Sequence, residues 1–274
     1  HVGAGTETWM PPEGHSQGQG GQMDYPFSYD VHPCGSLLYF ILSGGEHAFA
    51  GNHVYETQRN LIEGKHRKLR DLVKAFKQTK TSTEGESKTS SSNGHIEDEK
   101  IHPMEFHEAM HLIERMLQRH PNDRPKPLGG EDASLCMQVV LDHPFFMTST
   151  AKLEHVKRGK DTNWSSLQNK YLNGKQSVRW VNIPRLKNAK AFLEVAGQAN
   201  NYNNNLKGLA RFIRNVREHV YDCNGKTDSD LASFFEVDAV KREETTETDD
   251  MLVKYFAKAV PDLFLQLLKW PIQW

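Results

Sequence analysis

The sequence predicts an all-α fold, and two observations support that prediction. Apolar residues recur at steps of three and four in several stretches, as they do along one face of a helix. No stretch shows the strict alternation of apolar and polar residues that a half-buried strand requires. No segment repeats at a fixed period. With 274 residues, of which 37% are hydrophobic, the chain can form one large domain or two small ones.

Three helices are predicted in the first half of the chain. Residues 37–42 have the apolar pattern of a buried helix, which stops at Gly44. A second helix is predicted from four apolar residues at steps of four, three and four, namely Phe106, Met110, Ile113 and Leu117. Pro121 ends that helix, and a short third helix over residues 135–141 closes before Pro144.

A polar tract over residues 78–100 interrupts this helical pattern. Ser, Thr, Glu and Lys dominate the tract, and Ile96 is its one apolar residue. Such a segment cannot bury enough apolar surface to offset the entropy lost on ordering, so it is predicted to be disordered.

The second half of the chain has the strongest helical pattern. Six apolar residues fall on one face at about 100° per residue: Leu206, Leu209, Phe212, Ile213, Val216 and Val220. The opposite face is predicted to hold Lys207, Arg211, Arg214, Asn215 and Glu218, with His219 at the edge between the faces. An acidic loop is expected over residues 236–250, followed by an apolar helical stripe over residues 251–268 that Pro261 breaks into two pieces.

Charge and cysteine content narrow the classes of function. The chain has a net charge of −1, but residues 151–230 hold 15 Lys and Arg against 7 Asp and Glu. A basic segment of this kind indicates either a surface that binds a polyanion or an ordinary solvated face of Lys and Arg. Three widely spaced cysteines exclude a disulfide scaffold and a cysteine-based zinc pair. No run approaches the roughly 18 apolar residues of a membrane span, so no membrane contact is expected.

One short motif suggests a metalloprotease as a remote alternative. His107, Glu108 and His111 match H-E-x-x-H, in which two histidines on one helical face bind zinc and the glutamate acts as general base. The position of a third histidine ligand holds Leu117 instead, and Glu131 is the one plausible distal carboxylate. The other interpretation is a polar face of an amphipathic helix.

Four segments of residues 1–149 resemble, in the correct order, parts of the protein-kinase C-lobe. Residues 5–13 (GTETWMPPE) resemble the end of an activation segment, and residues 30–35 (DVHPCG) the start of the central helix. Residues 113–125 (IERMLQRHPNDRP) resemble the late helix with its R-P turn, and residues 143–146 (HPFF) the last helix.

This resemblance implies structural roles but no kinase activity. It implies that Glu13 pairs with Arg124 and that Asp30 opens the central helix. The glycine-rich loop, the strand lysine, the H-R-D loop and the D-F-G motif do not occur in the chain. The chain is therefore expected to bind neither ATP nor Mg²⁺ and to need no cofactor.

Residues 150–274 resemble the kinase-extension nuclease domain. That domain follows a kinase fold in the unfolded-protein-response sensor of the endoplasmic reticulum and in the oligoadenylate-activated antiviral ribonuclease. The main match is residues 209–219 (LARFIRNVREH), and residues 260–263 (VPDL) resemble the start of the C-terminal helix of the family. Trp180 falls where the family has a tryptophan. The expected fold is therefore a C-lobe half over residues 1–149 and a helical nuclease domain over residues 150–274.

The resemblance implies an endoribonuclease that needs no metal and leaves a 2′,3′-cyclic phosphate. His219 matches the catalytic histidine, Arg214 and Asn215 match residues that hold the phosphate, and Tyr202 is assigned as the catalytic tyrosine. Substrate contacts are expected from Arg211, Lys207 and Trp180, although Trp180 could be structural. Gly208 departs from the family, which has an aspartate at that position.

The implied partners are RNA and a second copy of the chain in a homodimer. The implied location is the cytoplasm, either free or as the cytosolic part of a reticulum membrane protein, in stress-response or antiviral RNA processing. The alternative is a non-catalytic module with a decayed nuclease site that binds RNA or dimerises.

Overall fold

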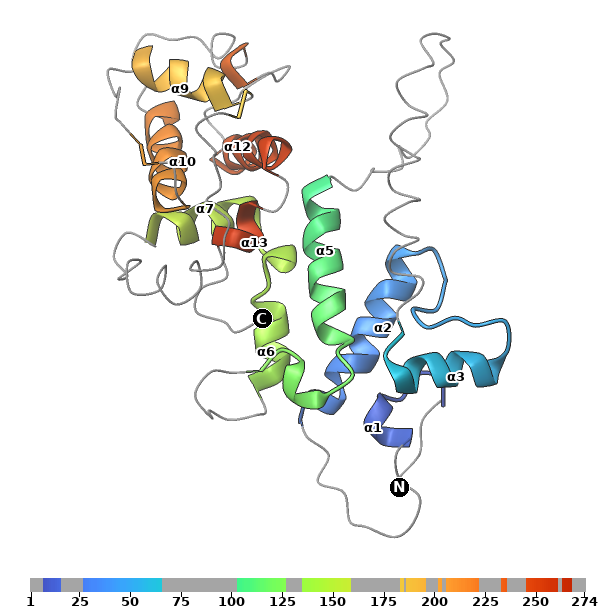
Figure 1. Cartoon of the computed structure of the whole chain (residues 1–274). Coiled ribbons are helices and arrows are strands. Elements are labelled where there is room, and N and C mark those ends of the chain that lie inside the picture. The colour runs from blue at the N-terminus through green and yellow to red at the C-terminus, as the bar shows by residue number, and fades with distance from the viewer. Residues whose placement is uncertain are drawn as a thin grey trace, which may run out of the picture. The chain divides into compact units, whose positions relative to one another are not determined.

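The structure of the chain is a computed structural model, and every regular element in its described residues is a helix (Figure 1). The described residues are 7–15, 27–65, 103–126, 135–158, 183–184, 186–195, 202–203, 206–221, 233–235, 245–260 and 263–267. This agrees with the predicted all-α class. The polar tract over residues 78–100 lies outside the described residues. Among the helices that the structure describes, none is long and apolar enough to cross a membrane.

The chain divides into two compact units, and the division falls within one helix and again after His143. Unit 1 contains the described residues up to 65, residues 109–126 and residues 135–143. Unit 2 contains residues 103–108 and the described residues from Pro144 onward.

Unit 1 contains a helix over the predicted residues 37–42, but the prediction that this helix is buried is wrong, because Leu37, Phe40 and Ile41 are exposed. The elements of unit 1 are α1 (Pro12–His15), η1 (Phe27–Tyr29), α2 (Val31–Leu42), α3 (Val54–Glu63), the later part of α5 (Pro103–Met116), η2 (Pro121–Asp123) and α6 (Cys136–Leu141). As predicted, α2 ends before Gly44, whose φ of 73° is in the left-handed region that favours glycine. Of the stripe predicted from Phe106 to Leu117, Ile113 and Leu117 are fully buried with Tyr39 of α2, and Met110 packs against them half-buried. Helix α5 itself ends at Met116, five residues before Pro121.

A glycine lets α2 approach the end of α5 closely. A Cβ atom on Gly35 would lie 2.7 Å from the Cβ of Met116 and 3.2 Å from Cδ2 of Leu117. Real Cβ atoms do not come this close to other heavy atoms, so only glycine fits without a shift of the helices. Gly35 is the glycine that ends the segment DVHPCG (residues 30–35), and this close packing is a physical reason for a glycine there.

The Glu13–Arg124 ion pair implied by the resemblance is present in unit 1. The guanidinium is bidentate, with Nη1 donating to Oε1 of Glu13 at 2.6 Å and Nη2 donating to Oε2 at 2.7 Å. The remaining donors reach backbone carbonyls: Nε reaches Gln118 at 2.9 Å, Nη1 reaches Ser28 at 3.1 Å and Nη2 reaches Arg119 at 3.2 Å. The five N–H groups of a guanidinium can therefore all be used, although the Arg124 side chain is fully buried.

Asp30 occupies the N-cap position of α2 without capping it through its side chain. Its backbone is in the helical region and its carboxylate makes no cap hydrogen bond. The side chain is exposed, and its negative charge adds to burial in raising the pKa of the Cys34 thiol. Asp30 therefore precedes the first residue of the helix, as expected, but its side chain does not cap the helix.

We expect the His47 imidazole to make the stability of unit 1 depend on pH. Its Nδ1 accepts the Phe49 N–H at 3.2 Å, and its ring lies 4.8 Å from that of Trp9. Burial lowers the pKa of His47 from the ordinary 6.5, and a backbone hydrogen bond to Thr8 opposes this only in part. A protonated ring could not accept the Phe49 N–H, so the unfolded chain takes up the proton first.

We therefore expect the free energy of unfolding to fall as the pH drops below about 6.5. The matched variant is His47→Asn, because the amide oxygen can replace the Nδ1 acceptor without titrating. Urea unfolding of both proteins at pH 7.5 and 5.5 should show wild type losing stability relative to the variant. A stability difference that stays constant between the two pH values would contradict the assignment.

Unit 2 is a cluster of helices around one apolar core. Besides the first residues of α5, it contains η5 (Pro144–Phe146), α7 (Ser149–Arg158), α9 (Leu186–Val195), α10 (Leu206–Tyr221), α12 (Thr245–Ala259) and α13 (Leu263–Leu267). Thr148 caps α7, since its Oγ1 accepts the Ala151 N–H at 3.2 Å. Helix α10 contacts α7, α9, α12 and α13, and it lies beside α7 and α9 in Figure 1. The break at Pro261 is confirmed, since α12 ends before it and α13 begins after it.

The prediction of an acidic loop over residues 236–250 is wrong for its last part. Residues 245–250 form the first turns of α12, and Thr248 and Asp249 are buried there. Acidic residues are favourable in the first turns of a helix, because they face the positive end of the helix dipole. Asp249 also has a cationic partner from another helix, Arg217 of α10, which a sequence pattern does not reveal.

Candidate functional site

The candidate site lies on α10, whose apolar face is the one predicted. Leu209, Phe212, Ile213, Val216 and Val220 are buried in the core of unit 2. Lys207, Arg211 and Glu218 are exposed, as expected for the opposite face. Asn215, also predicted for that face, is instead only 7% exposed. Its position at the border of the two faces lets its amide reach a neighbouring segment, and hydrogen bonds make its burial tolerable.

Three of the predicted site residues form a chain of hydrogen bonds. Nη2 of Arg214 donates to Oδ1 of Asn215 at 3.1 Å, and Nδ2 of Asn215 donates to the Tyr202 hydroxyl oxygen at 2.9 Å. Because a guanidinium can only donate, the Asn215 carbonyl must face Arg214 and the amide nitrogen must face Tyr202. The positive charge of Arg214 polarises the amide, and each bond of the chain strengthens the next. The Tyr202 hydroxyl acts as acceptor here, so its own proton is not used in this bond.

Tyr202 is held over α10 by its ring as well as by its hydroxyl. The ring meets Phe212 edge to face, with centroids 5.2 Å apart and planes at 81°. The guanidinium carbon of Arg211 lies 6.0 Å from the Tyr202 ring centroid, at the outer limit of a cation–π contact. Tyr202 is half-buried, so part of it remains at the surface beside Arg211. The sequence alone assigned Tyr202 only through the resemblance, and the structure places it against Arg211, Phe212 and Asn215.

His219 lies in the last turn of α10, one helical turn after Asn215. Residues four apart share a face of a helix, so the imidazole and the Asn215 amide are on the same side of α10. His219 is half-buried, which leaves its ring partly accessible from the surface.

Arg214 is enclosed more than an ordinary surface arginine. Its side chain is 18% exposed, and its Nε lies 3.9 Å from Oε2 of Glu218, too far for a hydrogen bond. Among the described residues, that buried Nε has no hydrogen-bond partner. The guanidinium therefore keeps unused donor capacity next to Asn215.

Of the predicted substrate-binding residues, two are placed and one is not. Lys207 and Arg211 are exposed one turn apart on α10, and Arg211 is the one that contacts Tyr202. Exposed Lys187 and Lys190 lie on the adjacent α9 and add to the positive charge of unit 2. Trp180 lies outside the described residues.

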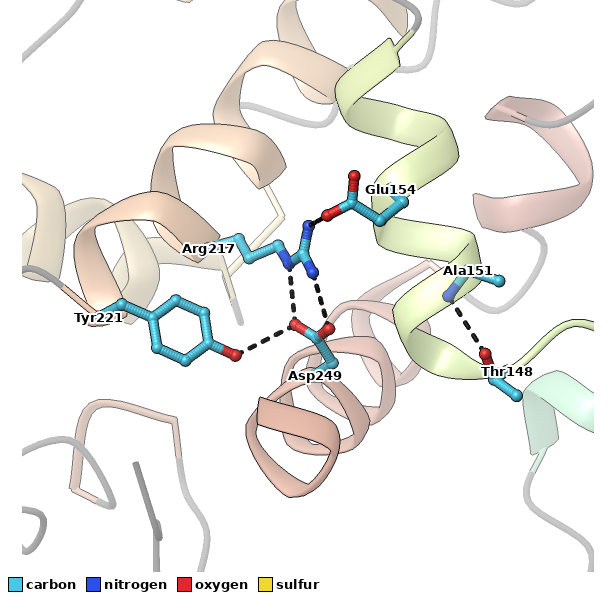
Figure 2. Close-up of polar contacts among 6 residues, drawn as sticks. All are labelled: Thr148, Ala151, Glu154, Arg217, Tyr221 and Asp249. Carbon is cyan, nitrogen blue, oxygen red and sulfur yellow. Dashed lines mark hydrogen bonds and ion pairs between the residues drawn. The ribbon is translucent and has the colours of Figure 1, made fainter. Parts of the chain in front are cut away.

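The sequence interpretation missed a second polar cluster, which fixes α10 to its neighbours (Figure 2). Arg217 donates two bonds of 2.8 Å to the carboxylate of Asp249 on α12 and one of 2.5 Å to Glu154 on α7. Tyr221 donates to Asp249 at 3.4 Å. Burial acts to lower the pKa of Arg217, but its two carboxylate partners outweigh burial and raise it. Burial and the charge of Asp249 raise the pKa of the Tyr221 phenol.

The contacts of this cluster show that Arg217 and Arg214, both on α10, have different roles. Arg217 joins three helices of unit 2, with Asp249 fully buried, so its role is structural. Arg214 is three residues earlier and donates instead to Asn215, which in turn donates to Tyr202. The spacing of basic residues in the sequence could not distinguish the two, because both lie in one short basic stretch.

The H-E-x-x-H residues have other partners. Oε2 of Glu108 accepts a 2.7 Å hydrogen bond from Nζ of Lys152, and both side chains are buried. Burial raises the pKa of Glu108, and Lys152 opposes that shift. Nδ1 of His111 is 3.0 Å from Nε2 of His143, and His107 is exposed. The described residues contain no group of three or more His, Cys, Asp or Glu placed to hold a metal ion. A buried ion pair explains the glutamate better than a general base does.

No protein-family model matches this chain, and no curated protein matches it.

Proposed function

We propose that the chain is an endoribonuclease that cleaves RNA without a metal ion at the polar side of α10. In this proposal, residues 150–274 are a kinase-extension nuclease domain and residues 1–149 are the half of a protein-kinase C-lobe that precedes it. The hydrogen-bond chain Arg214–Asn215–Tyr202 is the observation that supports it most strongly. It brings together three residues that the resemblance assigns to one active site.

The proposed reaction begins with attack by the 2′-hydroxyl oxygen of a nucleotide on the adjacent phosphorus. A new P–O bond forms, the bond to the 5′-oxygen breaks, and the product ends in a 2′,3′-cyclic phosphate. The 2′-hydroxyl must lose its proton and the departing 5′-oxygen must gain one, so the reaction needs a base and an acid. His219 takes part in this proton transfer. Tyr202 provides a hydroxyl at the phosphate, in an orientation set by Asn215.

Arg214 supplies the positive charge that a crowded phosphorane requires. Its donors would face the non-bridging oxygens, where charge increases in the transition state. Its enclosed position makes this interaction stronger than one in water, because the local dielectric is lower. Lys207 and Arg211 are exposed on the same helix and would hold the RNA backbone next to the reacting phosphate.

Assembly is part of the proposal. Two nuclease domains would act side by side, as the resemblance implies, so the rate should rise faster than linearly with protein concentration. ATP should have no effect, because the sequence contains none of the motifs of a nucleotide-binding lobe.

The test is incubation of an end-labelled RNA hairpin with the protein in EDTA. We expect slow cleavage at discrete positions, products that end in a cyclic phosphate, and binding that weakens steeply with salt. Arg214→Ala should lower the cleavage rate by about 10²–10³-fold, as loss of one transition-state donor does. Hairpin RNA that is bound but stays intact would instead support the non-catalytic RNA-binding module.

A further inference from the structure

Gly208, where the resemblance leads one to expect an aspartate, is packed against the backbone of another segment. It is the third residue of α10 and is buried. A Cβ atom at this position would overlap the carbonyl oxygen of Asn203 and lie 2.8 Å from its carbonyl carbon. These are backbone atoms, so no rotation of a side chain can relieve the overlap. Any residue other than glycine requires the Asn203 segment to move away from α10.

The segment that would have to move carries Tyr202. Residues 202 and 203 are consecutive, and both are held against α10. The Tyr202 ring packs on Phe212 and its hydroxyl accepts a hydrogen bond from Asn215, while the Asn203 backbone contacts Gly208. A hydrogen bond of 2.9 Å tolerates only a few tenths of an ångström before it weakens. Displacement of the Asn203 backbone therefore separates the Tyr202 hydroxyl from the Asn215 amide.

We propose that Gly208 is a positioning residue of the site: its missing side chain lets the Asn203 backbone close onto α10 and so holds the Tyr202 hydroxyl on Asn215. The consequence for catalysis rests on the nuclease function proposed above, whereas the consequence for Tyr202 does not. Gly208 is then an adaptation of this chain to the position of its tyrosine segment. Introducing an aspartate there would displace the segment and reduce activity.

The sign of the effect on stability distinguishes this role from an incidental glycine. In an ordinary helix, glycine to alanine is stabilising, and it would raise the Tm of a protein of this size by about 2 °C. Aspartate in the first turn would add a favourable interaction with the helix dipole. If Gly208 holds the segment in place, Gly208→Ala and Gly208→Asp both lower the Tm instead. A higher Tm for Gly208→Ala would overturn the proposal.

A spectroscopic test does not depend on activity. The side-chain amide NMR signals of Asn215 can be assigned by their loss in Asn215→Asp, and they should shift in Tyr202→Phe, which lacks the hydroxyl acceptor. In Gly208→Ala they should move toward the positions seen in Tyr202→Phe. Thr246→Ala, an exposed change in the first turns of α12, is the matched control and should leave them in place. Asn215 signals that stay at wild-type positions in Gly208→Ala would overturn the proposal.

Single-turnover cleavage of the RNA hairpin at saturating protein tests the catalytic consequence. Gly208→Ala should slow cleavage roughly 10–10²-fold with RNA affinity retained, because a displacement of about 1 Å has effects of this size. Added to Tyr202→Phe, it should cause no further loss, since both changes act on the same hydroxyl. Equal slowing in both backgrounds would contradict action through Tyr202. If wild type cleaves no RNA, the nuclease proposal fails, while the Asn215 signals still decide how Gly208 acts.

Discussion

We expect His219→Ala to lower the rate of RNA cleavage by about 10²–10⁴-fold, the usual contribution of a general acid or base. RNA affinity should change little, because the exposed cations that would hold the RNA backbone, Lys207 and Arg211, are kept. The measurement is single-turnover cleavage of the hairpin, with binding followed separately by filter retention at several salt concentrations.

Two further variants identify the role of His219. His219→Gln keeps hydrogen-bonding capacity but cannot transfer protons near neutral pH, so it should be as inactive as His219→Ala. Lys254→Ala, an exposed change on α12, is a control that should leave cleavage at the wild-type rate. If His219→Gln kept most of the activity, His219 would act by hydrogen bonding and the proton-transfer role would be wrong.

The second large effect concerns the fold of unit 1. Arg124→Ala should lower the free energy of unfolding by about 3–5 kcal/mol, as removal of one member of a buried pair does. The change leaves Glu13 without its partner and three backbone carbonyls without donors. A loss of this size corresponds to a Tm lowered by roughly 6–20 °C in a domain of 150–250 residues.

Calorimetry can follow this loss with two comparisons. Arg124→Lys keeps the positive charge but loses the planar fork, so it should recover only part of the stability. Arg119→Ala, which removes an exposed arginine five residues earlier, should change the Tm by less than about 2 °C. A similarly small change for Arg124→Ala would mean that the Glu13 contact contributes little.

Features that depend only on the residues of one segment were predicted correctly from the sequence. The stripe of α10 and the break at Pro261 follow from local periodicity and from the missing N–H of proline, and both occur in the structure. The Glu13–Arg124 contact joins residues 111 apart, and only the resemblance to a known fold could place them together.

Features that depend on contacts between segments were not predictable in the same way. The burial of Asn215 depends on Tyr202 lying over α10, and the structural role of Arg217 depends on Asp249 from α12. Gly208 is informative only once the Asn203 carbonyl is seen to lie against it. In each case the residue type is visible in the sequence, but the partner that gives it a role comes from elsewhere in the fold.

The most direct test of the proposed function is a hairpin RNA in which one nucleotide, on the 5′ side of a mapped cleavage position, carries 2′-hydrogen in place of 2′-hydroxyl. Cleavage by 2′-hydroxyl attack requires that oxygen, so the proposal predicts that wild-type protein in EDTA binds this RNA normally and no longer cuts it at that position. The other positions, which keep their 2′-hydroxyl groups, should be cut as before. Continued cleavage at the substituted position, or an unmodified hairpin that stays intact with concentrated protein, would contradict the proposal.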